Sequence, residues 1–427
     1  MSEQMIGQID TYIFGIACES KSRRYALTLL KDNKISVDVD GNPGKLYDGI
    51  GDHSVAFSMD GNHLAYAAKV GKDWYMVLDG IEQKRYDEVG NPVFTPDSKK
   101  LGYVASENRR QFVVLDNIEN KKYDFIGKGI PQFPVFSPDS RHVGYAAKSG
   151  KSFHVVIDET ESGPYDNIGQ GSPVFSPDSR RTAFQAKKNK FLGEESYMVV
   201  DGIEQKHYDA INHESIFSPD SQQVIYAAHK GNKWFTVINE KEGKQFNGIG
   251  ALTLSPNGTR LAYMAITSNK ASIVLDDAEG KVYNGYQELT FSPDSQHFAY
   301  RAAAGKKFLV VRDGIEGRQY DMIGGLVFTP DSKSLVYAAY GGTKGFLMTN
   351  DKEGKSYDKA GKFITFSPDS KHIAFVVASG NQEIVVIDDI ESKPYDNIPT
   401  KIFATENSFQ YIAFKDKKVY FVEEMLK

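Results

Sequence analysis

Short apolar runs separated by turn residues follow one another along the whole chain. In the segment 55–92, residues 55–57, 64–68 and 74–78 are apolar, and residues 81–86 form a more polar run. Gly, Pro, Asp and Asn lie between these runs, and no stretch keeps the period of an amphipathic helix. We therefore expect each such segment to form a meander of four antiparallel strands, with very low helix content in the chain.

A recurring phrase, Phe-Ser-Pro-Asp-Ser or a near variant, marks the end of the first strand in each copy. In this phrase, Pro fixes a turn corner and Asp accepts hydrogen bonds from nearby backbone amides. Successive copies are 37 to 42 residues apart, which indicates a repeat architecture whose units pack only on their neighbours. The anchoring apolar residues are Phe57, Phe94, Phe136, Phe175, Phe217, Leu254, Phe291, Phe328 and Phe366.

A degenerate copy follows Phe366 at the C-terminal end. Ile402–Glu406 stands in the anchor position, and residues 411–414 and 419–422 then supply the second and third strands. The sequence ends there, so this unit is predicted to lack a fourth strand of its own.

A second degenerate copy is predicted at the N-terminal end. Tyr12-Ile13-Phe14 reads as a first strand, and Met5-Ile6-Gly7 resembles Met322-Ile323-Gly324, which follows a fourth strand in a complete unit. We therefore expect residues 1–10 to form a strand stub that completes the last unit, so that the two termini share one blade.

The second strand of each unit is apolar at successive positions, as in residues 335–339, so it must be covered on both faces. Sheets stacked face to face around an axis meet this need, and residues 1–427 are predicted to form one all-β β-propeller array. The count is about eleven four-stranded antiparallel blades. A single closed ring is favoured because no linker interrupts the array; tandem rings of five and six blades are the alternative.

The repeated phrase, followed by an apolar strand such as Val143–Ala147, resembles the TolB-type, WD-like propeller repeat family. The family pattern has Ser-Pro-Asp-Gly, whereas most copies here have Ser in place of Gly, and only Gly61 and Gly258 keep it. A second element, Tyr-Asp-x-Ile-Gly, occurs at residues 123–127 and 165–169. The resemblance covers the whole chain and implies a propeller that binds protein or peptide more often than it carries chemistry.

Composition excludes several classes of function. The formal net charge of -5 gives no overall attraction to nucleic acid or anionic membranes, and Cys18 is the only cysteine, so no intrachain disulfide can form. No apolar run reaches 18 residues, so no membrane span is expected. The first twenty residues lack a secretion signal, which predicts a cytoplasmic protein as given, or a periplasmic or secreted one if a leader was removed.

No catalytic constellation is visible in the sequence. The chain has no Gly-x-Ser-x-Gly nucleophile motif, and its nine histidines lack metal-ligand spacing. The paired carboxylates Asp276-Asp277 and Asp388-Asp389 are expected at the hairpin between third and fourth strands. Because adjacent strand residues point to opposite faces, neither pair is expected to converge as an acid–base couple. We predict no catalytic residue, no metal and no cofactor.

Basic residues recur in the loops between second and third strands, and an aromatic residue often begins the third strand. These loops are expected on the same face as the repeated Asp of Tyr-Asp, such as Asp48 and Asp87. This surface is either a docking site for an acidic partner or a group of solvent-exposed loops whose lysines form salt bridges with those carboxylates. The candidate binding residues are Lys69, Lys72, Trp74, Arg109, Arg110, Lys148, Lys151, Lys187, Lys188, Lys230, Lys233, Trp234, Lys306 and Lys307.

The leading hypothesis is a monomeric, non-enzymatic scaffold that binds a protein or peptide, with an acidic or glycan ligand as a further option. Nucleic acid is not an expected partner. The alternative is a hydrolase or lyase with its site at the mouth of the central channel.

Overall fold

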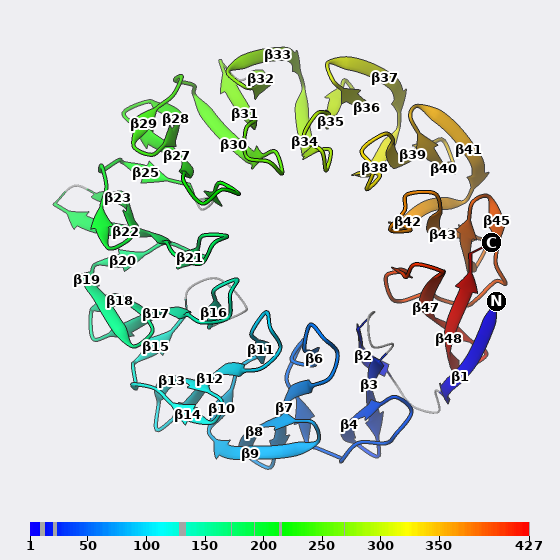
Figure 1. Cartoon of the computed structure of the whole chain (residues 1–427), viewed down its shortest axis with the longest axis horizontal. Coiled ribbons are helices and arrows are strands. Elements are labelled where there is room, and N and C mark those ends of the chain that lie inside the picture. Colours follow the sequence, from blue (N-terminus) through cyan, green and yellow to red (C-terminus); the bar gives the residue numbers. More distant parts are fainter. Residues whose placement is uncertain are drawn as a thin grey trace. The chain divides into compact units, whose positions relative to one another are not determined.

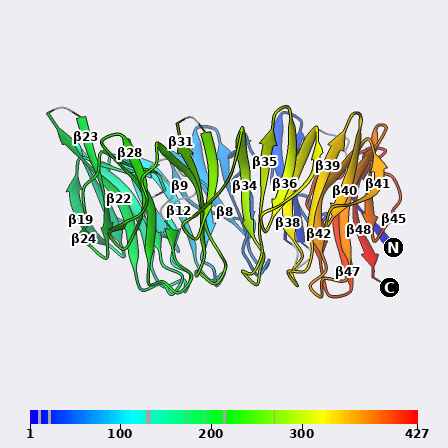
Figure 2. The same ribbon diagram turned by 90° about the horizontal axis from the view of Figure 1, so that it is seen from above.

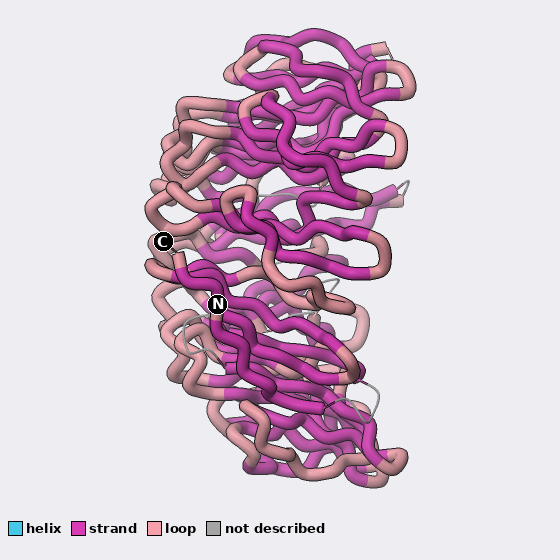
Figure 3. Tube along the Cα trace, turned by 90° about the vertical axis from the view of Figure 1, so that its right-hand side faces the viewer, coloured by secondary structure: helices cyan, strands magenta, loops and turns pink. Residues whose placement is uncertain are grey.

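The fold is all-β. The computed structural model describes residues 1–8, 13–19, 24–127, 134–171, 173–191, 193–212, 216–268 and 270–426. Over these residues the chain forms strands and loops without a helix (Figure 3). The strands form a single β-propeller of eleven antiparallel blades, which confirms the fold class and the blade count predicted from the repeats. We number the blades 1 to 11 by their second strands in chain order.

The blades fall into two groups, which we describe separately. Residues 11–243 contain the first group, of six blades, coloured blue to green in Figure 1. Blade 1 contains β2 (Ile13–Glu19), β3 (Arg24–Lys31) and β4 (Lys34–Val39); blade 2, β5 (Gly49–Ile50), β6 (Ala56–Phe57), β7 (Leu64–Val70), β8 (Asp73–Leu78) and β9 (Ile81–Tyr86); blade 3, β10 (Glu88–Val89), β11 (Val93–Phe94), β12 (Leu101–Glu107), β13 (Arg110–Leu115) and β14 (Ile118–Glu119). Blade 4 contains β15 (Phe125–Ile126), β16 (Val135–Phe136), β17 (Val143–Ser149), β18 (Ser152–Ile157) and β19 (Thr160–Tyr165); blade 5, β20 (Asn167–Ile168), β21 (Val174–Phe175), β22 (Thr182–Lys190), β23 (Gly193–Val200) and β24 (Ile203–Glu204); blade 6, β25 (Ala210–Ile211), β26 (Ile216–Phe217), β27 (Val224–Lys230), β28 (Lys233–Ile238) and β29 (Lys241–Glu242).

The second group consists of residues 1–10 and 244–427 and contains five blades. Blade 7 contains β30 (Gly248–Leu254), β31 (Leu261–Thr267), β32 (Lys270–Leu275) and β33 (Ala278–Tyr283); blade 8, β34 (Gly285–Phe291), β35 (Phe298–Ala304), β36 (Lys307–Arg312) and β37 (Ile315–Tyr320); blade 9, β38 (Met322–Phe328), β39 (Leu335–Gly341), β40 (Lys344–Thr349) and β41 (Lys352–Tyr357). Blade 10 contains β42 (Lys359–Phe366), β43 (Ile373–Ser379), β44 (Gln382–Ile387) and β45 (Ile390–Glu391); blade 11, β46 (Phe403–Ala404), β47 (Ser408–Lys415), β48 (Lys418–Met425) and β1 (Ser2–Gln8).

The first strand takes two forms. In blades 2 to 6 it is split into two pieces of two residues, whereas in blades 7 to 10 it is continuous with a register shift. In three of the split strands a proline lies directly before the second piece: Pro92 before β11, Pro134 before β16 and Pro173 before β21. Proline has no N–H to donate to a ladder, so pairing is interrupted there.

Blade 11 is completed by the N-terminal strand. β1 pairs antiparallel with β48, with Glu3 opposite Val422, and the two strands lie side by side in Figure 1. The chain termini therefore share a blade, as the sequence predicted. The detailed alignment was wrong: Met5-Ile6-Gly7 lies within the fourth strand, whereas Met322-Ile323-Gly324 begins β38, a first strand. Tyr12 lies outside the described residues.

The core is built between neighbouring blades. Five successive residues of β7, Leu64 to Ala68, are buried, and the same pattern recurs in β17, β27 and β39. One cluster joins Ala65 and Met76 of blade 2 to Tyr103 and Phe112 of blade 3. Small residues on one blade thus accommodate large ones on the next, which gives the dense packing that buried two-faced sheets need.

The serine that replaces glycine in the repeat connects neighbouring blades. Ser140 has a φ of 66°, the left-handed region that the family's glycine adopts without strain. Its Oγ accepts a hydrogen bond of 2.9 Å from the backbone N–H of Asp97 in the preceding blade. The hydrogen bond explains why the strained serine is retained. Equivalent bonds run from Asp60 to Ser98, Asp139 to Ser179, Asp178 to Ser221, Asn257 to Ser295, Asp294 to Ser332 and Asp331 to Ser370.

Fourth strands are connected by a second series of contacts. Glu119 of blade 3 accepts hydrogen bonds from Lys84 Nζ (2.5 Å) and Tyr86 Oη (3.1 Å) of blade 2. Lys84 and its equivalents are largely exposed, so each pair contributes little to stability by itself. Further basic residue–glutamate pairs are Lys45–Glu82, Lys121–Glu161 and Lys206–Glu242 in the first group, and Lys244–Glu279, Lys281–Glu316, Arg318–Glu353, Lys355–Glu391 and Lys393–Glu3 in the second.

The role of the repeat serine can be measured at Ser140. Ser140→Ala keeps the strained backbone and removes the hydrogen bond, so we expect a loss of about 1 kcal/mol in the free energy of unfolding. Ser140→Gly removes the same bond but relieves the strain, so it is expected to be the more stable of the two variants by about 1 kcal/mol. Urea denaturation checks both values. Equal stability of the two variants would contradict the strain argument.

The repeat aspartates predict acid sensitivity. Hydrogen bonds from the Ser58 hydroxyl and then the Asn62 N–H lower the pKa of Asp60 to about 2. The folded state therefore favours the charged carboxylate: its stabilisation is present above the ordinary pKa near 4 and is lost as the pH falls towards about 2. Asn257 fills the same position in blade 7 and also accepts from a serine hydroxyl. We expect Asp60→Asn to fold normally and to show a smaller drop in melting temperature between about pH 6 and about pH 2.5.

Candidate functional site

The loops between second and third strands are tight hairpins. Most are capped by the aspartate of the Tyr-Asp element, and those of blades 7 and 8 by an asparagine at the same position. In blade 2, Gly71 and Lys72 form the loop between β7 and β8, and the Gly71 N–H donates to Asp48 at 2.6 Å. Asp48 follows the third strand of blade 1, so the cap also joins two blades. Equivalent caps join Asp87 to Asn108, Asp124 to Gly150, Asp166 to Asn189, Asp209 to Gly231, Asp321 to Gly342 and Asp358 to Gly380.

Some of the predicted basic residues are neutralised inside the molecule. Arg110 forms an ion pair of 2.7 Å with Asp124, and Lys307 lies 3.6 Å from Asp321. Lys187 pairs with Glu194 across the β22–β23 hairpin at 2.5 Å. Arg110 and Lys307 thus pair with Tyr-Asp carboxylates, the role that the sequence offered as the alternative to docking, whereas Lys187 pairs with a different carboxylate.

Other predicted residues pack against aromatic side chains of the same blade. Lys69 Nζ lies 5.5 Å from the centre of the Trp74 ring, and Lys148 Nζ lies 5.3 Å from the Phe153 ring. In blade 6 the position of the lysine is taken by His229, whose ring centre lies 5.0 Å from that of Trp234. Cation–π contacts of this kind hold the aliphatic stems over the aromatic faces and fix the orientation of the loops.

A set of cations remains without an ion pair among the described residues, and we call it the basic edge. It comprises Lys72, Arg109, Lys151, Lys188 and Lys230, all exposed. Each lies in or near the loop between the second and third strands of a different blade, from blade 2 to blade 6 in order. Figure 2 shows the blades side-on, with hairpins and turns at their two ends. Lys233 of blade 6 and Lys306 of blade 8 likewise form no ion pair with another described residue.

The cap aspartates do not cancel the basic edge completely. The pKa of Asp48 is lowered, first by the Gly71 N–H and then by Lys34. The pKa of Asp358 is lowered by Lys344 and then by the Gly380 N–H. Both carboxylates thus already serve a hairpin amide and a basic side chain of their own, and the exposed cations of the basic edge are additional to these.

The histidines after the Asp-Ser turns are part of the blade framework. His63 Nδ1 lies 2.8 Å from Asp79 Oδ2, while the other oxygen of Asp79 accepts from the Leu64 N–H. The same arrangement holds for His142 with Asp158 at 2.5 Å. These side chains therefore connect the turn to the hairpin between third and fourth strands. Sequence spacing alone did not show this pairing.

The paired carboxylates lie at the hairpins between third and fourth strands, as the sequence predicted. Asp276 and Asp277 have φ values of 49° and 66°, so both are turn residues at the β32–β33 hairpin. Asp276 binds Arg260 and the Leu261 N–H, so it is a turn cap.

Chemical groups suited to metal binding or catalysis are sparse. The described part of the chain contains no cluster of three or more His, Cys, Asp or Glu residues that could hold a metal ion. Burial raises the pKa of Cys18 to about 12, so its thiol is unreactive at neutral pH. None of the described segments is a helix that could cross a membrane.

Comparisons with known proteins give distant structural similarities only. No protein-family model and no curated protein matches the chain. A crystal structure of the eukaryotic initiation factor has a TM-score of 0.44 and 14% identity, over 78% of this chain and 96% of that chain. The Dos1 propeller gives 0.32 and 12%, over 71% and 92%, and the Pyrococcus horikoshii acylaminoacyl peptidase gives 0.31 and 13%, over 68% and 57%. These values carry no inference about function.

The hairpin caps make a local prediction at Asp124. Asp124→Ala removes the acceptor for the Gly150 N–H (2.6 Å) and the partner of Arg110, so hydrogen exchange at Gly150 should speed up by about tenfold. Asp124→Asn keeps an acceptor oxygen and should restore most of the protection, because Asn284 caps Gly305 in the same way. Exchange measured by NMR or mass spectrometry checks the difference. Unchanged exchange in Asp124→Ala would show that the cap is dispensable.

Proposed function

We propose that the chain is a non-enzymatic scaffold, built from TolB-type, WD-like repeats, which acts as a monomer and binds an acidic protein or peptide. The partner docks on the basic edge of blades 2 to 6. The observation that carries the proposal is the recurrence, in five consecutive blades, of an exposed cation without an ion pair among the described residues near the loop between the second and third strands. Lys72, Arg109 and Lys151 are the second residue of that loop, and Lys188 and Lys230 lie near the end of the strand before it.

The repeated geometry suits an extended acidic segment. Lys72, Lys151 and Lys230 each lie beside a hairpin that an aspartate cap and a cross-strand pair hold in place. The cations are thus presented on ordered loops, which lowers the entropy cost of binding. Trp74, Phe153 and Trp234 add apolar surface next to the charges. Electrostatic complementarity of this kind governs the association rate and the choice of partner more than the final affinity.

A matched pair of charge-reversal variants tests the proposal. The test variant is Lys72→Glu, Lys151→Glu and Lys230→Glu combined. The control reverses three charges at the opposite ends of the second strands of blades 3, 4 and 5, namely Lys99→Glu, Arg141→Glu and Arg180→Glu. The probe is a fluorescein-labelled poly-glutamate peptide, and its fluorescence anisotropy reports binding.

The test variant is expected to bind the peptide at least about tenfold more weakly than the native protein, and the control about as well as the native protein. Added salt should weaken native binding, because exposed charges are screened beyond about 10 Å at about 0.1 M salt. Equal losses in the two variants would contradict docking at the basic edge. Tighter binding of a sulfated glycan than of the peptide would assign a glycan as the ligand instead.

A further inference from the structure

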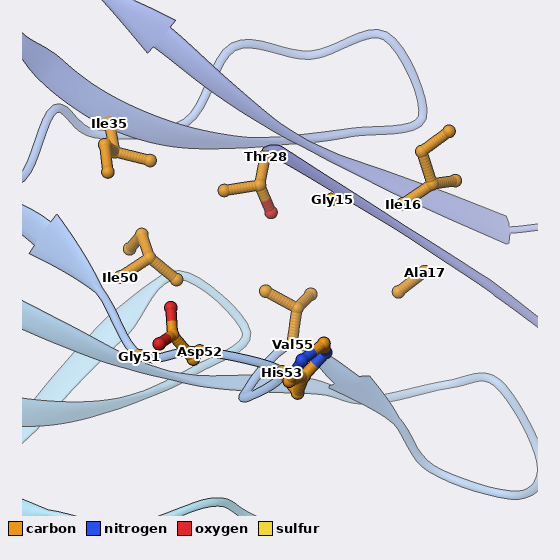
Figure 4. A pocket seen from close by; sticks show the side chains of 10 residues that line it. All are labelled: Gly15, Ile16, Ala17, Thr28, Ile35, Ile50, Gly51, Asp52, His53 and Val55. Atoms are coloured by element: carbon orange, nitrogen blue, oxygen red, sulfur yellow. The ribbon is translucent and has the colours of Figure 1, made fainter. Parts of the chain in front are cut away.

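A cavity of about 620 Å³ lies between blades 1 and 2, both in the first group (Figure 4). Its volume is in the range of sites for small organic ligands. The described lining combines apolar and polar groups, and its apolar side chains are Ile16, Ala17, Ile35, Ile50 and Val55. The cavity thus has the size and mixed lining of a ligand site, and neither feature depends on the basic edge.

A glycine in β2 leaves room for the cavity. Gly15 pairs with Thr28 near the register shift in the β2–β3 ladder, and a Cβ at Gly15 would lie 3.5 Å from Thr28 Oγ1. The absent side chain therefore leaves the hydroxyl of Thr28 open to the cavity. Blade 1 also lacks the phrase that closes the first strand of blades 2 to 6, which reads Ser-Met-Asp in blade 2, Thr-Pro-Asp in blade 3 and Ser-Pro-Asp in blades 4 to 6.

Thr28 is a buried polar residue without a partner. It is 8% exposed, and its hydroxyl has no hydrogen bond among the described residues. Figure 4 shows the hydroxyl pointing into the cavity. A hydroxyl in this position can donate a hydrogen bond to a polar atom of a ligand in the cavity or accept one from it.

A rigid turn presents two more polar side chains at the cavity. The Gly51 N–H donates to Ala67 O (2.9 Å), and the fully buried Ser54 donates to Gly51 O (2.8 Å). Asp52 and His53 lie between these anchors, and His53 has a left-handed φ of 55°. Neither side chain has a hydrogen bond or an ion pair within the described part of the chain. The corresponding segment of blade 3, Gly90-Asn91-Pro92-Val93, has neither an acid nor a histidine.

The charge at the cavity selects the class of ligand. Among the described lining residues, Asp52 is the only acidic one, and none is a lysine or an arginine. Figure 4 shows the Asp52 carboxylate directed into the same space as the Thr28 hydroxyl. A carboxylate beside apolar side chains, with no cation among these residues, favours a ligand with a positively charged group beside an apolar body.

We propose that this cavity binds a small organic amine, with its ammonium group on Asp52, its apolar body between blades 1 and 2, and a polar atom on the Thr28 hydroxyl. The site is independent of the proposed docking surface, since the two share no residue.

The test uses 2-phenylethylamine as the probe and isothermal titration calorimetry of the full chain as the measurement. Two comparison compounds keep the aromatic body and change the charge: 2-phenylethanol is neutral, and 3-phenylpropanoate is an anion. The amine is expected to bind saturably and at least about tenfold more tightly than either compound.

Three variants place the binding within the cavity. Asp52→Asn removes the charge while keeping the shape, and Gly15→Val fills the space over Thr28; each should weaken amine binding by about tenfold or more. Asp32→Asn is the matched control, because Asp32 is an exposed turn residue of blade 1 outside the cavity. The control should bind the amine as the native protein does. Melting curves show whether each variant is folded.

A fourth variant separates a ligand site from a structural role. Thr28→Val removes the hydroxyl at constant shape, so it should weaken amine binding while leaving the melting temperature close to that of the native protein. The proposal is overturned by the absence of saturable amine binding, by equal binding of the anion, or by native affinity in both Asp52→Asn and Gly15→Val. Native affinity in Thr28→Val would count against the contact with the hydroxyl.

Discussion

Burial of the second strand on both faces is the constraint on which the rest of the structure depends. Strands such as β7 and β39 have five consecutive buried residues, so no blade is stable with one face in water. Each sheet must therefore be flanked by others, and the contacts between blades become as important as the ladders within them. The Ser140 hydroxyl, the Glu119 carboxylate and the Asp48 carboxylate all act across a blade boundary, at three different heights of the blade.

Much of the fold could be predicted because the physical signals are repeated. The apolar runs at residues 64–68 and 74–78 correspond to β7 and β8, and Asp79-Gly80 is a hairpin with both φ values positive. The strand to which Met5–Gly7 belongs could not be predicted from residue similarity, because Gly and Ile occur in both first and fourth strands. The pairing identifies it as a fourth strand: Glu3 accepts a hydrogen bond from Tyr395, as Glu119 does from Tyr86. This contact joins residues that are far apart in the sequence.

The candidate surfaces were only partly visible in the sequence. The spacing of lysines placed Lys72 and Lys151 on hairpins correctly, but it could not distinguish them from Lys187, which is neutralised by Glu194. The amine cavity escaped notice because it arises from departures from the repeat. Gly15 and Thr28 lie in blade 1, which lacks the repeated phrase. Asp52 lies in a turn of blade 2, where the corresponding turn of blade 3 has no acid. In a repeat protein the common residues determine the fold, and the exceptions are where a specific ligand site can form.

The pairing of β1 with β48 has a consequence for biosynthesis. β1 leaves the ribosome before the strands of all the other blades, and its partner β48 follows them. Blade 11 therefore cannot be finished until β48 has been made, although the preceding blades can dock in the order in which they emerge. Throughout this period β1 has an unpaired edge, and its polar residues Ser2, Glu3 and Gln4 keep that edge from attracting other nascent chains.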